Sequence, residues 1–339
     1  MSTLPGIIHI TGEHDVGKTT MALECGAMPE KICFFDDDLK GRSVVQDLEE
    51  ADVELGAYHD LVTLGKGKKG IDFYHAVMEV IDKIKPGQFE VIIFDTWARF
   101  AGCMHEYVLA HPQEFRSKYS AKGDIKGGQQ WQDTHRLEAE TLTKLQSLAR
   151  TVILVTHLRD HRMGGVVTGK QEPQGSKTLS RVCRLRVWLR PNADSPVPIA
   201  LVLKRLDTKV KSKSGALRTV SVLPRKIVPD AATESVWDTI AQYITDPVDT
   251  KKLRPHEIPD AYELSLLEGT LTAEQKRTFQ QMLDAGLIGL EPEEIDIEAI
   301  AEKARELSGP PKGIADALSE EFGTDVTVAQ VVRWRWADD

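Results

Sequence analysis

Eight residues near the start of the chain constrain its fold more than any other feature. Residues 12–19 match the pattern G-x-x-x-x-G-K-[ST] in full. They follow a short apolar run at 6–11 that favours a β-strand, and they precede a stretch at 18–27 that suits a helix. A glycine-rich loop between a strand and a helix wraps so that backbone N–H groups face phosphate oxygens. The sequence therefore predicts a phosphate-binding loop within an α/β fold.

Two side chains of this loop have separate expected roles. Lys18 reaches the β and γ phosphates of a nucleotide, and the Thr19 hydroxyl takes a place on Mg²⁺. We expect Lys18 to be exposed when the loop is empty. ATP and Mg²⁺ are therefore the predicted cofactors. The predicted nucleotide-binding residues are Gly12, Glu13, His14, Asp15, Val16, Gly17, Lys18, Thr19 and Thr20.

Three further apolar segments, each with a polar residue at or after its end, predict more strands of the same sheet. Residues 32–35, 91–94 and 151–156 are predominantly apolar. Because strands of this kind are buried on both faces, they predict a parallel sheet covered by helices. Helical patterns fit between them at 73–84 and 130–150.

The end of the sheet is expected to be antiparallel. Residues 182–189, 199–206 and 217–223 read as strands without long helices between them. A polar hairpin tip fits at 209–215. In the helix that precedes these strands, Trp131 is expected to join the apolar stripe that packs on the sheet.

Asp95 follows the run at 91–94, at the position where a carboxylate is needed to hold the magnesium ion, often through water. We interpret it as the Walker B aspartate. With these motifs the chain resembles the RecA-like ATPases over residues 6–225, and within them the short phage and plasmid proteins of the nucleotide-binding or replicative-helicase-like type. The resemblance implies an α/β fold with a RecA-like P-loop core.

The resemblance also implies an acidic residue after the strand at 32–35 that polarises the attacking water. By spacing, Asp38 takes this place, although the family usually has Glu and the Asp side chain is shorter. Asp36 or Asp37 could serve instead. An acidic turn or a helix N-cap is the structural alternative for these residues.

His157 follows the run at 151–156, where RecA-like proteins carry a polar residue that senses the γ-phosphate. The resemblance therefore assigns His157 as this sensor, with a purely structural histidine as the alternative. A metal pair formed with His161 is disfavoured, because no third ligand lies near them in the sequence.

The strand predicted at 199–206 resembles the late strand on which hexameric RecA-like helicases present a Lys and an Arg to the nucleotide of the neighbouring subunit. Such a residue neutralises charge on the transferred phosphoryl group. The resemblance implies this role for Arg205 first and for Lys204 second, while Lys209 and Lys177 remain open. It also implies a homo-oligomer, as a ring or a filament.

Two long connections combine aromatic and cationic side chains, at 100–129 and at 159–176. Long loops are often functional, and this combination suits stacking on bases and pairing with phosphates of single-stranded DNA. An ordinary surface loop is the alternative. The predicted nucleic-acid-binding residues are Arg116, Lys118, Tyr119, Lys122, Lys126, Arg159, Arg162 and Lys170.

The charge is divided unevenly along the chain. Residues 231–339 carry 10 Lys and Arg against 23 Asp and Glu, a net charge of −13, which leaves +4 for residues 1–230. Residues 181–229 alone hold 12 basic and two acidic residues. This split suggests an anion-facing core with an acidic appendage, and a solvated charged surface is the alternative.

We predict three parts: a RecA-like ATPase core at 1–229, an acidic helical linker region at 230–295 and a helix-turn-helix-like unit at 296–339. The last two would form a small acidic α-helical domain. Only Arg333 and Arg335 are cationic on the second helix of that unit, so we prefer docking to a protein partner over duplex recognition.

The four cysteines include no close pair, which excludes a zinc ribbon or a CxxC redox motif built from them by spacing. They are interpreted as reduced, half-buried thiols of a cytoplasmic protein. Neither a leader segment at the start nor an apolar run of about 18 residues is recognisable, so neither secretion nor a membrane is expected.

Together these features predict a homo-oligomeric, magnesium-dependent ATPase that acts on single-stranded DNA in recombination, annealing or replication. No primase or amino-terminal helicase domain is recognisable before Gly12, which favours the phage recombination type over a plasmid-type hexameric helicase. The alternative of another class is a regulatory nucleotide switch that controls protein contacts through its acidic C-terminal part.

Overall fold

The structure, a computed structural model, describes most of the first 245 residues and a few later positions. The chain divides into two compact units, Met1–Ile258 and Pro259–Asp339, and the helices and strands with described bounds belong to the first unit. Apart from Ala317 and Leu318, the predicted helix-turn-helix-like unit lies outside the described residues. The described residues are 4–37, 39–50, 53–68, 70–116, 129–163, 166–174, 177–192, 195–204, 207–211, 217–221, 223–229, 235–245, 259, 263, 267, 277, 317 and 318.

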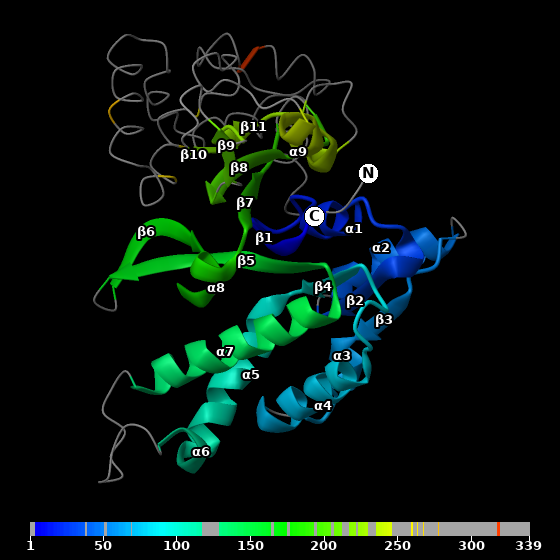
Figure 1. The fold of residues 1–339 in the computed structure, drawn as a ribbon, viewed down its shortest axis with the longest axis vertical. Coiled ribbons are helices and arrows are strands. Elements are labelled where there is room, and N and C mark those ends of the chain that lie inside the picture. The colour runs from blue at the N-terminus through cyan, green and yellow to red at the C-terminus, as the bar shows by residue number, and fades with distance from the viewer. Residues whose placement is uncertain are drawn as a thin grey trace. The chain divides into compact units, whose positions relative to one another are not determined.

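A mainly parallel sheet forms the centre of the first unit (Figure 1). Its strand order is β11-β8-β7-β1-β5-β4-β2-β3, and β6 pairs with β5 outside this path. The strands from β3 to β7 in this order run parallel, whereas β8, β11 and β6 pair antiparallel with their neighbours. The strands are β1 Gly6–Gly12, β2 Ile32–Asp36, β3 Ala57–Asp60, β4 Val91–Asp95, β5 Thr151–Met163, β6 Val166–Pro173, β7 Leu185–Arg190, β8 Ile199–Lys204 and β11 Lys226–Ile227. A separate hairpin joins β9 Asp207–Lys211 and β10 Leu217–Ser221.

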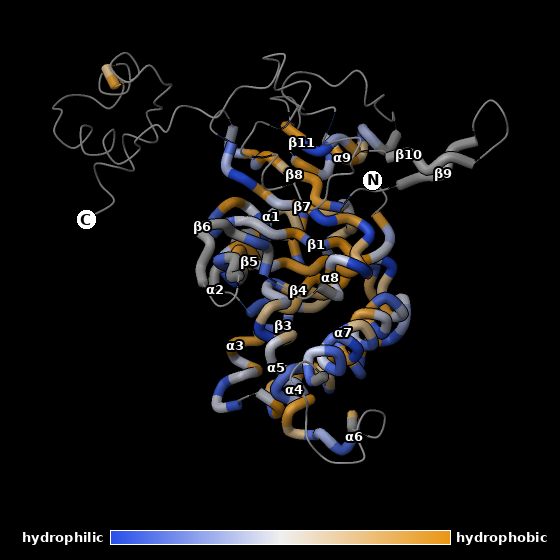
Figure 2. Tube along the Cα trace, turned by 90° about the vertical axis from the view of Figure 1, so that its left-hand side faces the viewer, coloured by the Kyte–Doolittle hydropathy of each residue, from blue (hydrophilic) through white to orange (hydrophobic). Residues whose placement is uncertain are grey.

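Helices cover both faces of the sheet, because consecutive residues of the central strands are mostly apolar and their side chains point to opposite faces. Ile8 and Ile10 of β1 belong to a core that includes residues of α1, α2 and α9, whereas Ile7 belongs to a second core with α3, α4, α5, α7 and α8. Figure 2 shows the hydrophobic residues gathered along the central strands. The helices are α1 Lys18–Leu23, α2 Leu39–Glu50, α3 Leu61–Leu64, α4 Gly70–Lys83, α5 Trp97–Ala110, α6 Pro112–Arg116, α7 Gln129–Leu148, α8 Lys177–Val182 and α9 Val236–Thr245, with a 3-10 turn at Pro29–Lys31.

This architecture confirms the α/β part of the predicted fold class, a mainly parallel sheet flanked by helices, with the predicted phosphate loop between β1 and α1. The predicted antiparallel end is present where β8 pairs with β7 and β11 pairs with β8. The strand predicted at 217–223 instead pairs with β9 in the separate hairpin, and β9 includes the first residues of the tip predicted at 209–215. Among the helices described, none is both long enough and apolar enough to cross a membrane.

The connection predicted at 100–129 is not a loop over most of its described part. It contains most of α5 and all of α6, and residues 117–128 lie outside the described residues. The helix extends this far because Phe100, Met104 and Val108 are spaced four residues apart and are all buried.

The connection predicted at 159–176 is a β-hairpin over its described part. Strand β5 does not end at His157 but continues to Met163, where it turns back into β6. Arg159 lies opposite Glu172 in this hairpin, and its Nη2 is 2.9 Å from Glu172 Oε1. An opposite-charge pair across two strands favours continued pairing over a loop.

The tryptophan at the start of α7 differs from its prediction. Trp131 is 51% exposed, while Leu142, Leu145 and Leu148 further along the helix are buried against the sheet. The ring of Trp131 instead stacks on that of His105 from α5, with 4.0 Å between centroids. The apolar stripe of α7 therefore begins after its first turns.

Helix α9 lies within the predicted linker region 230–295, and its apolar side chains belong to the first core. Val236, Trp237 and Ile240 are buried there. Trp237 Nε1 also donates a hydrogen bond to the carbonyl oxygen of Met21 in α1. The first compact unit thus includes a helix beyond Pro229.

All four cysteines are free and buried, rather than half-buried as predicted: Cys25, Cys33, Cys103 and Cys183. Burial raises the pKa of the Cys33 thiol to about 12. It is also the main cause of the raised pKa values of the other three thiols. They are protonated, unreactive thiols at neutral pH.

One histidine is fully buried inside the sheet, and its ionisation should make folding stability depend on pH. Burial and the nearby Arg186 lower the pKa of His9 from 6.5 to about 3. Below pH 6.5 the His9 side chain binds a proton in the unfolded chain but not in the folded chain. The free energy of unfolding is therefore highest above pH 6.5 and falls on acidification towards pH 3. Between about pH 7.5 and 5.5, the wild type should lose roughly 1.4 kcal/mol more unfolding free energy than His9→Gln.

Urea unfolding of the two proteins at both pH values measures this difference. The other histidines are common to both, so their contributions cancel. Equal losses in the two proteins would show that His9 titrates normally in the folded state.

Candidate functional site

A cavity of about 280 Å³ lies at the carboxyl edge of the parallel strands. The strand register brings this edge together, because Gly12 aligns with His157 and Asp36 aligns with Asp95. Its lining residues are His14, Asp15, Gly17, Lys18, Thr19, Thr20, Ser43, Val44, Asp95 and His157. The predicted phosphate loop, Walker B aspartate and sensor histidine therefore meet in one place.

The two motif glycines are required by the shape of the loop. A Cβ on Gly12 would lie 2.7 Å from the carbonyl oxygen of Leu189 and 2.8 Å from Val16 Cγ1, closer than real Cβ contacts. Gly17 has φ +85°, a left-handed conformation that side chains disfavour, and it immediately precedes α1. The loop is thus held in a wrapped conformation at the N-terminus of the helix, which suits phosphate binding.

Lys18 is buried, at 6% exposure, which corrects the expectation of an exposed side chain. Its Nζ donates a hydrogen bond to the carbonyl oxygen of Glu13 in the same loop. The loop closes around the ammonium group because the carbonyl satisfies one of its donors. An entering phosphate would meet a lysine that is already positioned by the loop.

Thr19 and Asp95 form the part of the cavity that fits a magnesium ion. Thr19 Oγ1 donates a hydrogen bond to Asp95 Oδ2 over 2.5 Å, and Asp95 is 2% exposed. A hydroxyl and a carboxylate side by side are oxygen ligands of the kind that Mg²⁺ takes, with water and phosphate completing its shell. The donor set therefore fits this ion, and the roles of Thr19 and Asp95 in holding it stay predictions.

His157 contacts the phosphate loop directly. Its ring stacks on that of His14, with 4.3 Å between centroids and 23° between planes. His14 occupies a variable position of the loop motif, so nothing in the motif indicates this contact. The stack joins the end of the predicted sensor segment to the loop that would hold the phosphates.

The acidic residues after β2 differ in their surroundings. Asp36 is buried and accepts a hydrogen bond of 2.8 Å from the Tyr58 hydroxyl, and burial together with Asp36 raises the pKa of Tyr58. Asp37 forms an ion pair with Arg99, with 2.5 Å from Oδ1 to Nη1. Neither lines the cavity, and Asp38 lies outside the described residues. The role of Asp38 stays a prediction.

Ser43 and Val44 line the cavity and were not identified from the sequence. Both belong to α2, which begins at Leu39, directly after the acidic residues at the edge of the sheet. A helix that follows a parallel strand starts at that same edge, so its first turns are near the phosphate loop. Recognising a helix at 39–50 would have indicated that Ser43 and Val44 lie near the phosphate loop.

Of the four candidates for a cation that reaches the nucleotide of a neighbouring subunit, the structure describes the side chain of Lys204 alone. Lys204 Nζ donates hydrogen bonds to the carbonyl oxygens of Ser180 and Arg181, at 3.2 and 2.8 Å. A cation on the last carbonyls of α8 stabilises that helix end. Arg205 lies outside the described residues, and of Lys177 and Lys209 the backbone alone is described.

The predicted nucleic-acid-binding residues are likewise divided. Arg159 is ion-paired with Glu172 on the hairpin. Arg116 ends α6, while Arg162 and Lys170 belong to β5 and β6. The remaining four, Lys118, Tyr119, Lys122 and Lys126, lie outside the described residues.

Comparisons with known proteins found one family match and a similarity among solved structures. A family model described as "AAA domain" matches residues 5–182 of the chain. No curated protein sequence matches. Among solved structures, one described as "Crystal structure of the RadB recombinase" is similar, with a TM-score of 0.38 and 15% sequence identity over 66% of this chain and 90% of that chain.

Proposed function

Because this chain belongs to the AAA domain family, we propose that it binds ATP with Mg²⁺ in the cavity at the carboxyl edge of the sheet and hydrolyses it. One observation supports this most directly. Lys18, Thr19 and Asp95 converge on a single cavity beside a loop whose shape requires its two motif glycines. A chance glycine-rich turn would not bring a buried lysine and a magnesium-type donor pair together.

Each residue of the site has a separate role in the proposed phosphoryl transfer. Backbone N–H groups of the loop and the N-terminus of α1 would hold phosphate oxygens, and Lys18 would neutralise the β and γ phosphates. A magnesium ion held by Thr19 and Asp95 supplies further charge neutralisation when bound. In our proposal Asp38 orients the attacking water and accepts its proton, while His157 responds to the γ-phosphate.

We further propose single-stranded DNA as the partner and recombination or annealing as the setting. The support is the distribution of charge, with +10 net over residues 181–229, and the cationic residues on α6 and on the β5–β6 hairpin. Contacts to phosphates need no base sequence, which suits binding to any strand.

Hydrolysis with and without single-stranded DNA is the experiment that tests this function. The full chain should release phosphate from ATP in the presence of Mg²⁺, and the rate should rise several-fold when single-stranded DNA is added. Hydrolysis that ignores DNA would support the regulatory switch instead, for which the net charge of −13 over residues 231–339 is the favouring observation. No hydrolysis under either condition would contradict the proposed activity.

A head-to-tail homo-oligomer is proposed as the active form, with Arg205 acting on the nucleotide of the neighbouring subunit. Arg205→Ala should lower hydrolysis by on the order of 1,000-fold, the size typical of a trans-acting arginine, while ATP affinity is retained. When the Arg205→Ala protein is mixed in equal amounts with the Lys18→Ala protein, activity should return at about a quarter of the subunit interfaces. At that fraction of interfaces, a subunit with an intact phosphate loop lies beside a subunit with an intact Arg205.

Phosphate release from the mixture, compared with each variant alone, measures this recovery. The exposed Arg150, replaced by Ala, is the matched control and should behave as the wild type. A mixture that shows only the average of the two inactive variants would rule out a role of Arg205 in trans.

A further inference from the structure

A line of hydrogen bonds crosses the sheet behind the phosphate loop. Arg186 Nε donates to His9 Nδ1 over 3.0 Å, and His9 Nε2 lies 2.7 Å from Thr156 Oγ1. Thr156 Oγ1 donates to Thr11 Oγ1 over 3.2 Å, and Thr11 Oγ1 donates to the carbonyl oxygen of His157 over 3.3 Å. The line thus passes from β7 through β1 and β5 to the residue that stacks on the loop.

All hydrogens in this line point the same way. Because His9 Nδ1 accepts from Arg186, a neutral His9 carries its proton on Nε2 and donates it to Thr156. Each threonine has one hydroxyl hydrogen and passes it onward, so the last one reaches His157. The lowered pKa of His9 keeps the ring neutral at physiological pH and the direction unchanged.

The line is sealed from water. His9, Thr11 and Thr156 are all 0% exposed. Replacing paired buried polar groups by apolar groups of similar shape is nearly neutral for stability, so stability alone does not call for polar residues here. The neighbouring Ile8 and Ile10 of the same strand are apolar.

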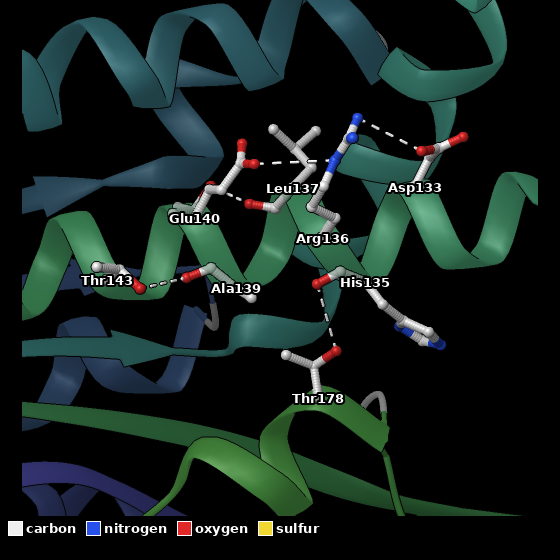
Figure 3. Close-up of polar contacts among 9 residues, drawn as sticks. Asp133, His135, Arg136, Leu137, Ala139, Glu140, Thr143 and Thr178 are labelled. Atoms are coloured by element: carbon white, nitrogen blue, oxygen red, sulfur yellow. Dashed lines mark hydrogen bonds and ion pairs between the residues drawn. The ribbon is translucent and has the colours of Figure 1, made fainter. Parts of the chain in front are cut away.

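The far end of the line is attached to α8. Arg186 Nη1 donates to Ser180 Oγ over 2.7 Å. Helix α8 is tied to α7 in turn, since Thr178 Oγ1 donates to the carbonyl oxygen of His135 over 3.4 Å (Figure 3). The base of the β5–β6 hairpin meets the line at His157, because the backbone N–H of Gln174, directly after β6, donates to the same His157 carbonyl oxygen over 2.8 Å.

We propose that His9, Thr11 and Thr156 are positioning residues that hold His157 against His14 at the phosphate loop, and that they connect this pair to the base of the β5–β6 hairpin. The part concerning hydrolysis rests on the proposed function.

Thr11→Val is the sharpest test, because it keeps the shape of the side chain and removes the last hydroxyl of the line. The kcat for ATP should fall about 10- to 100-fold, the range seen when support of a functional group is removed or the group is slightly misplaced. The KM for ATP should change by less than about threefold, because the loop and Lys18 remain. Thr11→Ser keeps the hydroxyl and should recover most of kcat.

A spectroscopic readout tests the positioning without reference to hydrolysis. In protein labelled with ¹⁵N-histidine, the imidazole signals of His14 and His157 should move in Thr11→Val and stay near their wild-type positions in Thr11→Ser. Thr151→Val is the matched control, since Thr151 is a buried threonine of β5 whose hydroxyl bonds to the Leu4 carbonyl, outside the line. It should leave the same signals unchanged.

The outcomes separate the two proposals. If the wild type does not hydrolyse ATP, the proposed function fails, while the imidazole signals still decide the positioning role. Unmoved signals in Thr11→Val, or a rise in KM with kcat unchanged, would overturn the positioning role. Should Thr11→Val not fold, Thr156 offers a second test one hydrogen bond earlier in the line. Thr156→Val removes its hydroxyl and should lower kcat and move the imidazole signals, whereas Thr156→Ser keeps the hydroxyl and should stay near the wild type.

Discussion

Replacing Lys18 by Ala should reduce ATP hydrolysis by on the order of 100- to 1,000-fold, the size typical when one fixed charge or donor at the reacting group is removed. The ammonium group is buried in the loop, and its hydrogen bond to the Glu13 carbonyl positions it before phosphate arrives. Phosphate release under saturating ATP and Mg²⁺ measures the loss.

The burial of Lys18 makes a stability control necessary. Thermal unfolding should show that Lys18→Ala remains folded, because the ammonium group is hydrogen-bonded to the carbonyl oxygen of Glu13 within the loop. Lys83→Ala removes a lysine whose side chain is 72% exposed on α4, and it should hydrolyse ATP at the wild-type rate. Wild-type turnover in a folded Lys18→Ala protein would contradict the assignment of the loop.

Replacing Asp95 by Asn should abolish magnesium-dependent hydrolysis to a similar extent, roughly 100- to 1,000-fold. Asn keeps the size of the side chain and can still accept the hydrogen bond from Thr19, but it removes the negative charge that holds the metal. Nucleotide binding measured without Mg²⁺ should be retained, while the strengthening of binding by Mg²⁺ should be lost.

Asp72→Asn is the matched control, because Asp72 is an exposed aspartate in the first turn of α4. It should show the wild-type dependence on Mg²⁺. If Asp95→Asn responds to Mg²⁺ as the wild type does, another carboxylate holds the metal, and Asp38 would be the next to test.

Where the signal is local, the sequence predicts residues that line the cavity, among them Lys18, Thr19 and Asp95. The loop motif, the apolar strand before it and Asp95 at the end of another buried strand are all read from neighbouring residues, and parallel pairing brings them to one edge. The burial of Lys18 was not predictable in this way, because it depends on how the loop closes and not on which residues it contains.

Features that depend on the pairing of distant strands could not be predicted. His9 reads only as a polar residue within an apolar strand, and its partners Thr156 and Arg186 are brought to it by the register of β5 and β7 against β1. Ser43 was missed because the helix at α2 was not recognised. The extension of β5 to Met163 was missed because a polar strand outside the core lacks an apolar pattern.

The hydrogen bond from Trp237 to Met21 has a practical consequence for dissecting this protein into fragments. A fragment cut after Pro229 would lack the helix that covers α1, and the apolar surface around Met21 would face water. It would be prone to aggregate, whatever its catalytic residues. The shortest fragment that keeps this packing extends through Thr245, so a nucleotide-binding fragment must carry α9 with it.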